Sequence, residues 1–113
     1  MPLYLVKTGK KRLLFANIEQ KGYFGQFIGL MFRATFSTPL LFNGNDRIVI
    51  HSFFCPEFDA VFLNKQRRIV KLVKVKPWTP KIAASAVFLF ECPAGTIEKF
   101  KLRNGSELQW TAK

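Results

Sequence analysis

The stretch from Ile50 to Leu63 contains most of the chain's reactive side chains, set among apolar, strand-forming residues. It holds the only histidine, His51, and Cys55 follows four residues later. Side chains four positions apart on a strand point to the same face, so this pair is able to bind a transition metal or to form a thiol activated by imidazole. A structural zinc site normally takes four ligands, and the chain contains no C-x-x-C pair. We therefore favour a buried thiol beside a hydrogen-bonded histidine, and we predict no metal.

Asp59 is the second candidate because it lies between Phe58 and Ala60 in the same apolar stretch. Strands this hydrophobic normally lie in a protein core. A carboxylate in a core either finds a partner or bears a large desolvation cost. The sequence therefore predicts a polar site at Asp59, although it does not identify a reaction.

The elements that position these residues are mainly strands, because short β-prone runs recur along the chain between turn residues. Eight strands are predicted, at Leu3–Lys7, Arg12–Ile18, Pro39–Phe42, Arg47–Phe54, Phe58–Leu63, Arg68–Lys76, Ala86–Cys92 and Glu107–Thr111. The turn residues Thr8–Lys10 predict a hairpin between the first two strands. A second turn at Asn43–Asp46 predicts another hairpin between the third and fourth.

Two short helices are expected beside these strands. Apolar residues recur at helical spacing between Gly22 and Arg33, and Thr96 is expected to cap a second helix through Lys101. Lys76–Ser85 carries two prolines around Trp78 and is expected to be an ordered loop. The predicted fold is mainly β, a β-rich α+β domain built as a β-sandwich or a partly open barrel.

The length of 113 residues suits a single domain, 1–113, with one core. Hydrophobic residues make up 49% of the chain and thirteen residues are Phe, which excludes a disordered protein. No apolar run approaches the ~20 residues of a membrane helix and the first residues have no leader-like pattern, so we expect a soluble, cytoplasmic protein. We also expect a monomer. Nothing points to an oxidising compartment, and Cys55 and Cys92 are therefore expected to be reduced thiols.

Three motifs, read in order, resemble one family, the domain of unknown function 192, also known as uncharacterised protein family 0127. They are G-L-M-F-R at Gly29–Arg33, F-D-A-V-F-L at Phe58–Leu63, and F-E-C-P-A-G at Phe90–Gly95, where the family usually has L-E-L-P-A-G. The chain departs from the family before Asp59, where many members have W-M-K-N-T and this one has I-H-S-F-F at Ile50–Phe54. The resemblance implies a compact β-rich fold and brings no established activity.

The resemblance singles out Arg33, Asp59 and Glu91, the charged members of these otherwise apolar motifs. A guanidinium is able to bond two carboxylates at once and to hold both ionised in an apolar shell. The group is interpreted either as a structural salt bridge that fixes the helix on the sheet or as a charged pocket that anchors a ligand. Breaking a buried pair of this kind leaves an unpaired charge, at a cost of ~3–5 kcal/mol.

Positive charge is concentrated between residues 65 and 81, and the formal charge of the whole chain is +11. The candidate polyanion-binding residues of this basic stripe are Lys65, Arg67, Arg68, Lys71, Lys74, Lys76 and Trp78, with Lys81 at its end. Lysines along a strand are able to follow a phosphate backbone, and Trp78 is able to stack on a base. The alternative is an ordinary solvated face whose lysines prevent sheet-to-sheet aggregation. Neither Phe nor Tyr accompanies Trp78 within the stripe, which weakens the stacking hypothesis.

The chain contains no phosphate-binding loop, metal-spacing motif or nucleophile elbow. We therefore expect a small non-catalytic module that binds a ligand or assists another protein, with no cofactor. Two alternatives stay open. One is nucleic-acid binding through the basic stripe, and the other is an enzyme or metal protein that uses His51, Cys55, Asp59 and Glu91.

Overall fold

A five-stranded sheet forms the centre of the computed structural model, which describes residues 3–7, 10–15, 19–21, 40–44, 46–53 and 56–111. In spatial order its strands are β3 (Glu19–Lys21), β4 (Leu40–Asn43), β9 (Phe88–Pro93), β6 (Phe58–Leu63) and β7 (Ile69–Val75). Neighbouring strands are antiparallel, except that β3 and β4 run parallel. The middle strand, β9, and its neighbour β6 carry the two motifs with buried carboxylates.

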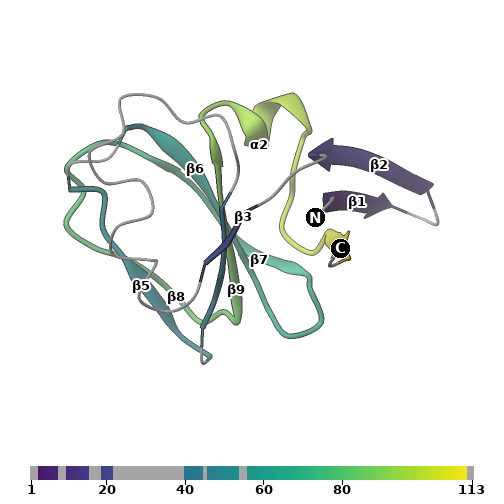
Figure 1. Cartoon of the computed structure of the whole chain (residues 1–113), viewed down its shortest axis with the longest axis horizontal. Helices are drawn as coiled ribbons and strands as arrows, with labels where there is room; N and C mark the ends of the chain where they lie inside the picture. Colours follow the sequence, from purple (N-terminus) through teal and green to yellow (C-terminus); the bar gives the residue numbers. More distant parts are fainter. Residues whose placement is uncertain are drawn as a thin grey trace.

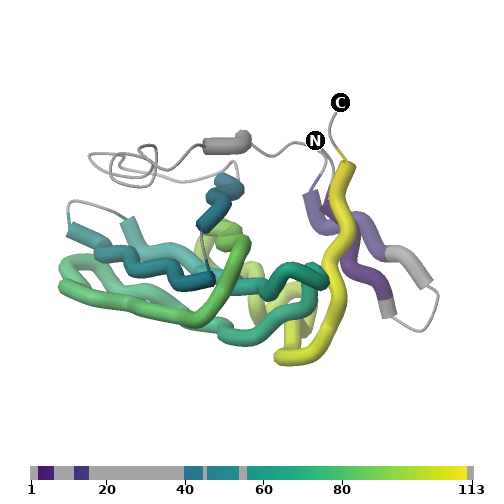
Figure 2. The backbone as a smooth tube through the Cα atoms, turned by 90° about the horizontal axis from the view of Figure 1, so that it is seen from below, coloured from purple at the N-terminus to yellow at the C-terminus, as the bar shows by residue number. Residues whose placement is uncertain are grey.

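Two smaller antiparallel sheets flank the central one (Figure 1). One contains, in order, β10 (Glu107–Trp110), β1 (Leu3–Lys7) and β2 (Lys10–Phe15). The other pairs β5 (Ile48–Ile50) with β8 (Ile82–Ala84). The short helix α2 (Thr96–Lys99) directly follows β9 and lies beside β2, and Figure 2 shows the β10–β1–β2 sheet standing at one end of the molecule.

Side chains alternate along the central strands, so the sheet has two buried sides. On the side covered by the β10–β1–β2 sheet, named here the β1 side, Val61 packs in one core with Leu5 and Leu108. On the side covered by β5 and β8, named the β5 side, Phe62 packs in a second core with Ile48. Every residue of β6 is buried, as expected for a strand covered on both faces.

The predicted β-rich class is confirmed. Strands occur at all eight predicted places, and the bounds predicted for Leu3–Lys7 and Phe58–Leu63 are those observed. The first two strands form the predicted hairpin. The three sheets do not close into a barrel within the described part of the chain, and the choice between a sandwich and a partly open barrel stays a prediction.

Two predictions about connections are wrong. The second predicted hairpin does not form, because β4 pairs with β3 and β9 while β5 pairs with β8 in another sheet. The expected loop Lys76–Ser85 contains a strand, β8, which makes one of ten strands in the described part of the chain rather than about eight. A three-residue strand between prolines and small residues is too short to show an alternating pattern in the sequence.

The predicted cap of the second helix is also wrong. Gly95, with φ of 93°, takes the N-cap position, and the helix ends at Lys99. Thr96 instead donates its hydroxyl hydrogen to the carbonyl oxygen of Pro93 at 2.6 Å. The helix predicted for Gly22–Arg33 lies outside the described residues. Where the structure describes the chain, it has no helix with the length and hydrophobicity that a bilayer crossing requires.

Candidate functional site

Asp59 is buried on the β1 side of the central sheet, with 2% of its surface exposed. In the strand pairings it lies opposite Lys74 of β7 and Cys92 of β9. Its Oδ2 atom accepts a hydrogen bond from the backbone N–H of Ile97 at 2.8 Å. The predicted need for a partner is thus met by a backbone donor of α2, and this bond ties the helix to the sheet.

Glu91 is similarly buried, at 4% exposed, but it lies on the opposite, β5 side. Its strand partners are Ala60 of β6 and Leu40 of β4, both members of the β5-side core. Burial raises the pKa of Glu91 to about 8, because the charged form loses its solvation by water. The Glu91 side chain is therefore mostly protonated at neutral pH.

The two carboxylates of the predicted charged group consequently do not share one face of the sheet. Residues directly opposite in an antiparallel pair lie on the same face, and Asp59 pairs with Cys92, the residue after Glu91. Arg33, the third member, lies outside the described residues. The predicted bridge of one guanidinium to both carboxylates stays a prediction, and the described strands place its two acceptors on opposite sides of β6 and β9.

His51 uses one of its ring nitrogens within its own loop. Its Nδ1 atom accepts a hydrogen bond from the backbone N–H of Phe53 at 3.1 Å, which leaves the proton of the neutral ring on Nε2. Cys55 lies outside the described residues, so the predicted pairing of His51 with Cys55 stays a prediction. In the part of the chain that the structure describes, no three His, Cys, Asp or Glu side chains lie close enough together to hold a metal ion.

Cys92 is a free thiol with 1% of its surface exposed. Burial raises its pKa well above the usual range, and the neighbouring charges of Asp59 and Glu91 raise it further. A thiol held protonated in a core is neither a nucleophile nor a metal ligand. Cys92 therefore behaves as the buried, reduced thiol that the sequence predicted.

A pocket of about 370 Å³ opens on the β1 side, between β2 and the segment that follows β9. Its lining residues are Leu14, Phe15, Pro93, Ala94, Gly95, Thr96, Lys99 and Phe100. The P-A-G part of the third motif therefore forms one wall of the pocket. Sequence reasoning missed this site because the opposite wall, β2, lies some eighty residues away in the chain. The one local sequence signal was the glycine at position 95, which favours a left-handed turn and adopts one here.

Two hydrogen bonds hold the Pro93–Ile97 segment, which forms one wall of the pocket. Thr96 bonds to Pro93, and Ile97 bonds to buried Asp59. Two other lining residues, Phe15 of β2 and Phe100 after α2, meet edge to face with their ring centroids 6.1 Å apart. Asp59 therefore contributes to this site as a support for its wall.

Two cations lie close to the ring of Phe100, one of the residues that line the pocket. The guanidinium carbon of Arg12 lies 5.0 Å from the centroid of the Phe100 ring, and Nζ of Lys99 lies 5.4 Å from it. Arg12 also donates to the carbonyl oxygen of Lys99 at 3.5 Å. The pocket thus combines apolar walls with positive charge at its edge.

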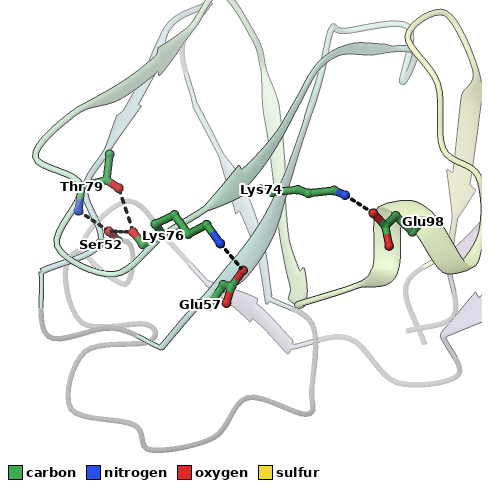
Figure 3. A network of polar contacts seen from close by, with 6 residues as sticks. All are labelled: Ser52, Glu57, Lys74, Lys76, Thr79 and Glu98. Atoms are coloured by element: carbon green, nitrogen blue, oxygen red, sulfur yellow. Dashed lines mark hydrogen bonds and ion pairs between the residues drawn. The ribbon is translucent and has the colours of Figure 1, made fainter.

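The basic stripe is divided between the two sides of the sheet. Lys74 lies opposite Asp59 on the β1 side, whereas Lys71 lies opposite Phe62 on the β5 side. Both are engaged: Lys74 forms an ion pair with Glu98 of α2 (Figure 3), and Nζ of Lys71 donates to the carbonyl oxygen of Ala83 at 2.8 Å. The hydrogen bond with Glu98 raises the pKa of Lys74 and lowers that of Glu98.

Other members of the stripe also have acceptors within the protein. Arg67 donates to the carbonyl oxygen of Trp110 at 3.0 Å and lies 4.0 Å from the centroid of its ring. Arg68 donates to the carbonyl oxygen of Gly105 at 3.2 Å. Lys76 lies 3.4 Å from the carboxylate of Glu57 (Figure 3). The stripe is therefore not the single row of uncommitted cations that its sequence suggested.

Trp78, the aromatic member of the stripe, is 59% exposed and does not stand apart from other rings. Its ring centroid lies 5.9 Å from that of Phe53, and the Phe53 centroid lies 4.9 Å from that of His51. These three side chains form a surface named here the Trp78 row. The basic stripe itself contains no Phe or Tyr, as its sequence shows, and the aromatic neighbour of Trp78 is Phe53, which lies outside the stripe.

Comparison with known proteins identifies relatives across most of the chain. A UPF0127 protein of Pyrococcus furiosus is 35% identical over 94 residues, covering 75% of this chain and 78% of the relative. A UPF0127 protein of Thermococcus sibiricus is 31% identical over 96 residues, covering 78% of this chain and 61% of the relative. Neither name describes an activity.

Two solved structures share the fold. A protein of unknown function from Novosphingobium aromaticivorans superposes with a TM-score of 0.79 at 18% identity, covering 96% of this chain and 84% of its own. A putative transcription regulator from Sinorhizobium meliloti gives a TM-score of 0.82 at 18% identity, with 96% and 91% covered. Residues 14–110 match the profile of DUF192, described as an uncharacterized ACR. The chain therefore belongs to the DUF192 family, as its three motifs indicated.

Proposed function

We propose that this protein is a non-catalytic binding module whose pocket between β2 and Pro93–Phe100 holds a small organic anion with an apolar body. The observation that carries this proposal is the pocket itself. Its volume of about 370 Å³ falls within the range of small-molecule sites, roughly 300–1,000 Å³. Its mixture of apolar walls and cationic edge matches a carboxylic acid with a short hydrocarbon or aromatic part.

The lining residues support binding over catalysis. Lys99 is the one ionisable group among the described residues of the lining. The hydroxyl of Thr96 donates its hydrogen to Pro93 and is committed to that bond. A cation and a committed hydroxyl provide orientation and charge, whereas acid–base chemistry needs a group that exchanges protons with the substrate.

The two alternative functions receive less support from the described residues. An enzyme that uses Asp59 and Glu91 together would need them on one face of the sheet, and they lie on opposite faces. Nucleic-acid binding along the whole basic stripe would need cations directed to one surface, and most of them bond to the protein itself. The predicted monomeric and cytoplasmic state stays a prediction.

The proposal is tested by titrating the ¹⁵N-labelled protein with hexanoate and, separately, with 1-hexanol. We expect hexanoate to shift the amide signals of Gly95, Thr96 and Lys99, and we expect the uncharged alcohol to bind more weakly. Lys99→Gln should weaken hexanoate binding about two- to fivefold, the range for an exposed ion pair. Ala94→Phe, which fills the pocket from an exposed position, should abolish it.

Lys101→Gln is the matched control, because Lys101 is exposed and lies next to α2 but outside the pocket lining. It removes the same charge and should leave hexanoate binding unchanged. Equal losses of hexanoate affinity in the Lys99 and Lys101 variants would show that the overall charge of the protein, and not the pocket, attracts hexanoate. Shifts that are confined to surfaces away from the pocket would refute the proposal.

A further inference from the structure

The loop between β7 and β8 holds Trp78 in an unusual backbone conformation. The residue has φ of 63°, in the left-handed region that a bulky side chain rarely occupies and that costs of order 1–3 kcal/mol. The structure keeps this conformation even though more than half of the Trp78 surface is exposed to water. Burial of the indole therefore does not explain this conformation, and the loop around Trp78 must hold it.

Ser52 holds this loop in place through hydrogen bonds. The side chain of Ser52 is fully buried, and its hydroxyl donates to the carbonyl oxygen of Lys76 at 2.6 Å and accepts from the N–H of Thr79 at 2.7 Å (Figure 3). The Ser52 backbone bonds the same loop twice, to the Thr79 carbonyl at 2.9 Å and from the Trp78 N–H at 3.1 Å. Four hydrogen bonds from one residue leave the loop little freedom, so Trp78 is presented in a preset orientation.

The Trp78 row extends this presented ring into a surface of three aromatic side chains. The planes of Phe53 and Trp78 are inclined by 43°, and those of His51 and Phe53 by 32°. Trp78 is exposed, whereas His51 and Phe53 are half-buried behind it. An exposed ring supported in this way resembles the stacking sites of proteins that bind single strands, where each base stacks on an aromatic side chain. Duplex bases are already stacked on one another and offer no free face to such a platform.

The charge around the row suits a polyanion. Lys76 and Lys81 flank Trp78 in the same loop, and both are exposed. Among the described residues, the ion-pair partner of Lys76 is Glu57, an exposed carboxylate at 3.4 Å that a phosphate group is able to replace. No other carboxylate occurs in the chain between Asp59 and Glu91.

We propose that the Trp78 row binds single-stranded nucleic acid, with a base stacked on Trp78 and the neighbouring phosphates near Lys76 and Lys81. His51 directly follows β5 and Trp78 lies in the loop before β8, so this surface belongs to the β5–β8 part of the fold and shares no residue with the pocket on the β1 side. It confines the predicted nucleic-acid binding to the last members of the basic stripe, Lys76, Trp78 and Lys81, and adds Phe53 and His51 from outside it. Recognition of this kind is strongly dependent on salt and shows little sequence preference.

The test measures fluorescence anisotropy of a labelled twelve-nucleotide oligothymidylate, and of a duplex of the same length, at ~50 mM salt. We expect the single strand to bind more tightly than the duplex and to quench tryptophan emission through the exposed Trp78, since Trp110 is buried. Trp78→Ala should weaken single-strand binding about 5- to 150-fold, while Trp78→Phe should keep most of it. Ser52→Ala should weaken it less than Trp78→Ala does, by loosening the loop.

Lys81→Gln and Lys65→Gln form the matched pair of controls, because each removes one exposed charge from the same part of the sequence. The proposal requires a larger loss of binding from Lys81→Gln. Equal losses in the two variants, equal affinity for duplex and single strand, or unchanged binding by Trp78→Ala would each overturn it and leave only the general attraction of a protein of charge +11 for polyanions. Ala94→Phe should not affect this binding, which separates the outcome from that of the pocket experiment.

Discussion

The two sides of the central sheet each bury one carboxylate, and they solve the problem of its charge differently. On the β1 side, Asp59 accepts a backbone hydrogen bond from α2. On the β5 side, Glu91 lies among apolar residues and has a pKa raised to about 8 by burial. Asp59 is thus stabilised by a donor, whereas Glu91 is accommodated by binding a proton. The polar side is also the side on which the pocket opens.

The largest predicted effect concerns Glu91 and pH. Its pKa is higher in the folded protein than the ordinary 4.5, so the folded state binds the proton more tightly and is most stable below pH ~4.5 with respect to this group. This stability should be lost progressively as the pH rises from about 4.5 to 8, and a shift of this size corresponds to about 5 kcal/mol.

The measurement is the free energy of unfolding in urea between pH 5 and pH 8.5. Glu91→Gln, which stays neutral at every pH, should remove most of the decline and be more stable than the wild type at pH 8.5. If the substituted protein and the wild type lose stability in parallel, Glu91 is ionised in the folded state and the contrast between the two sides disappears.

An intermediate effect is predicted for Asp59. Asp59→Ala removes the acceptor of the Ile97 N–H and should lower the free energy of unfolding by about 1–3 kcal/mol. Asp59→Asn keeps an oxygen acceptor and should lose less. Because the bond supports the pocket wall, the alanine variant should also broaden the amide signals of Thr96 and Lys99, while a variant of Glu91 should leave these signals sharp.

The smallest effect is predicted for the ion pair between Lys74 and Glu98, which also joins the β1 side to α2 (Figure 3). Both side chains are exposed over at least half of their surface, so water and salt screen their attraction. A double-mutant cycle with Lys74→Gln and Glu98→Gln should give a coupling energy close to zero at ~0.15 M salt. A coupling as large as the loss in Asp59→Ala would show that the surface pair, and not the buried carboxylate, attaches the helix.

The strands and the family were predictable from the sequence, because apolar runs, turn residues and motifs are local features. These local features were sufficient to predict the bounds of the strands Phe58–Leu63 and Leu3–Lys7. The pairing of β5 with β8 was not predictable, since β8 has only three residues and its partner lies more than thirty residues away in the chain. The pairing that places Asp59 and Glu91 on opposite faces depends on a one-residue difference in register, which no sequence pattern records.

The functional surfaces were less predictable than the fold for the same reason. Both are formed by residues that are distant in sequence: Phe15 meets Phe100 at the pocket, and Phe53 meets Trp78 in the row. The run of lysines was visible in the sequence, but the acceptors that engage most of them were not. Charge density along a chain therefore overstated how much of that charge is available to a partner.

The pairing of β1 with β10 determines the order in which the protein is able to fold during synthesis. Leu5 lies opposite Leu108. One edge of β1 pairs with β2, and its other edge stays unpaired until β10 has been synthesised. At a translation rate of roughly 5–20 residues per second, that interval is about 5–20 s. During this time the β1–β2 hairpin has an open edge and an uncovered apolar face, which makes the nascent chain a candidate for chaperone binding until β10 emerges.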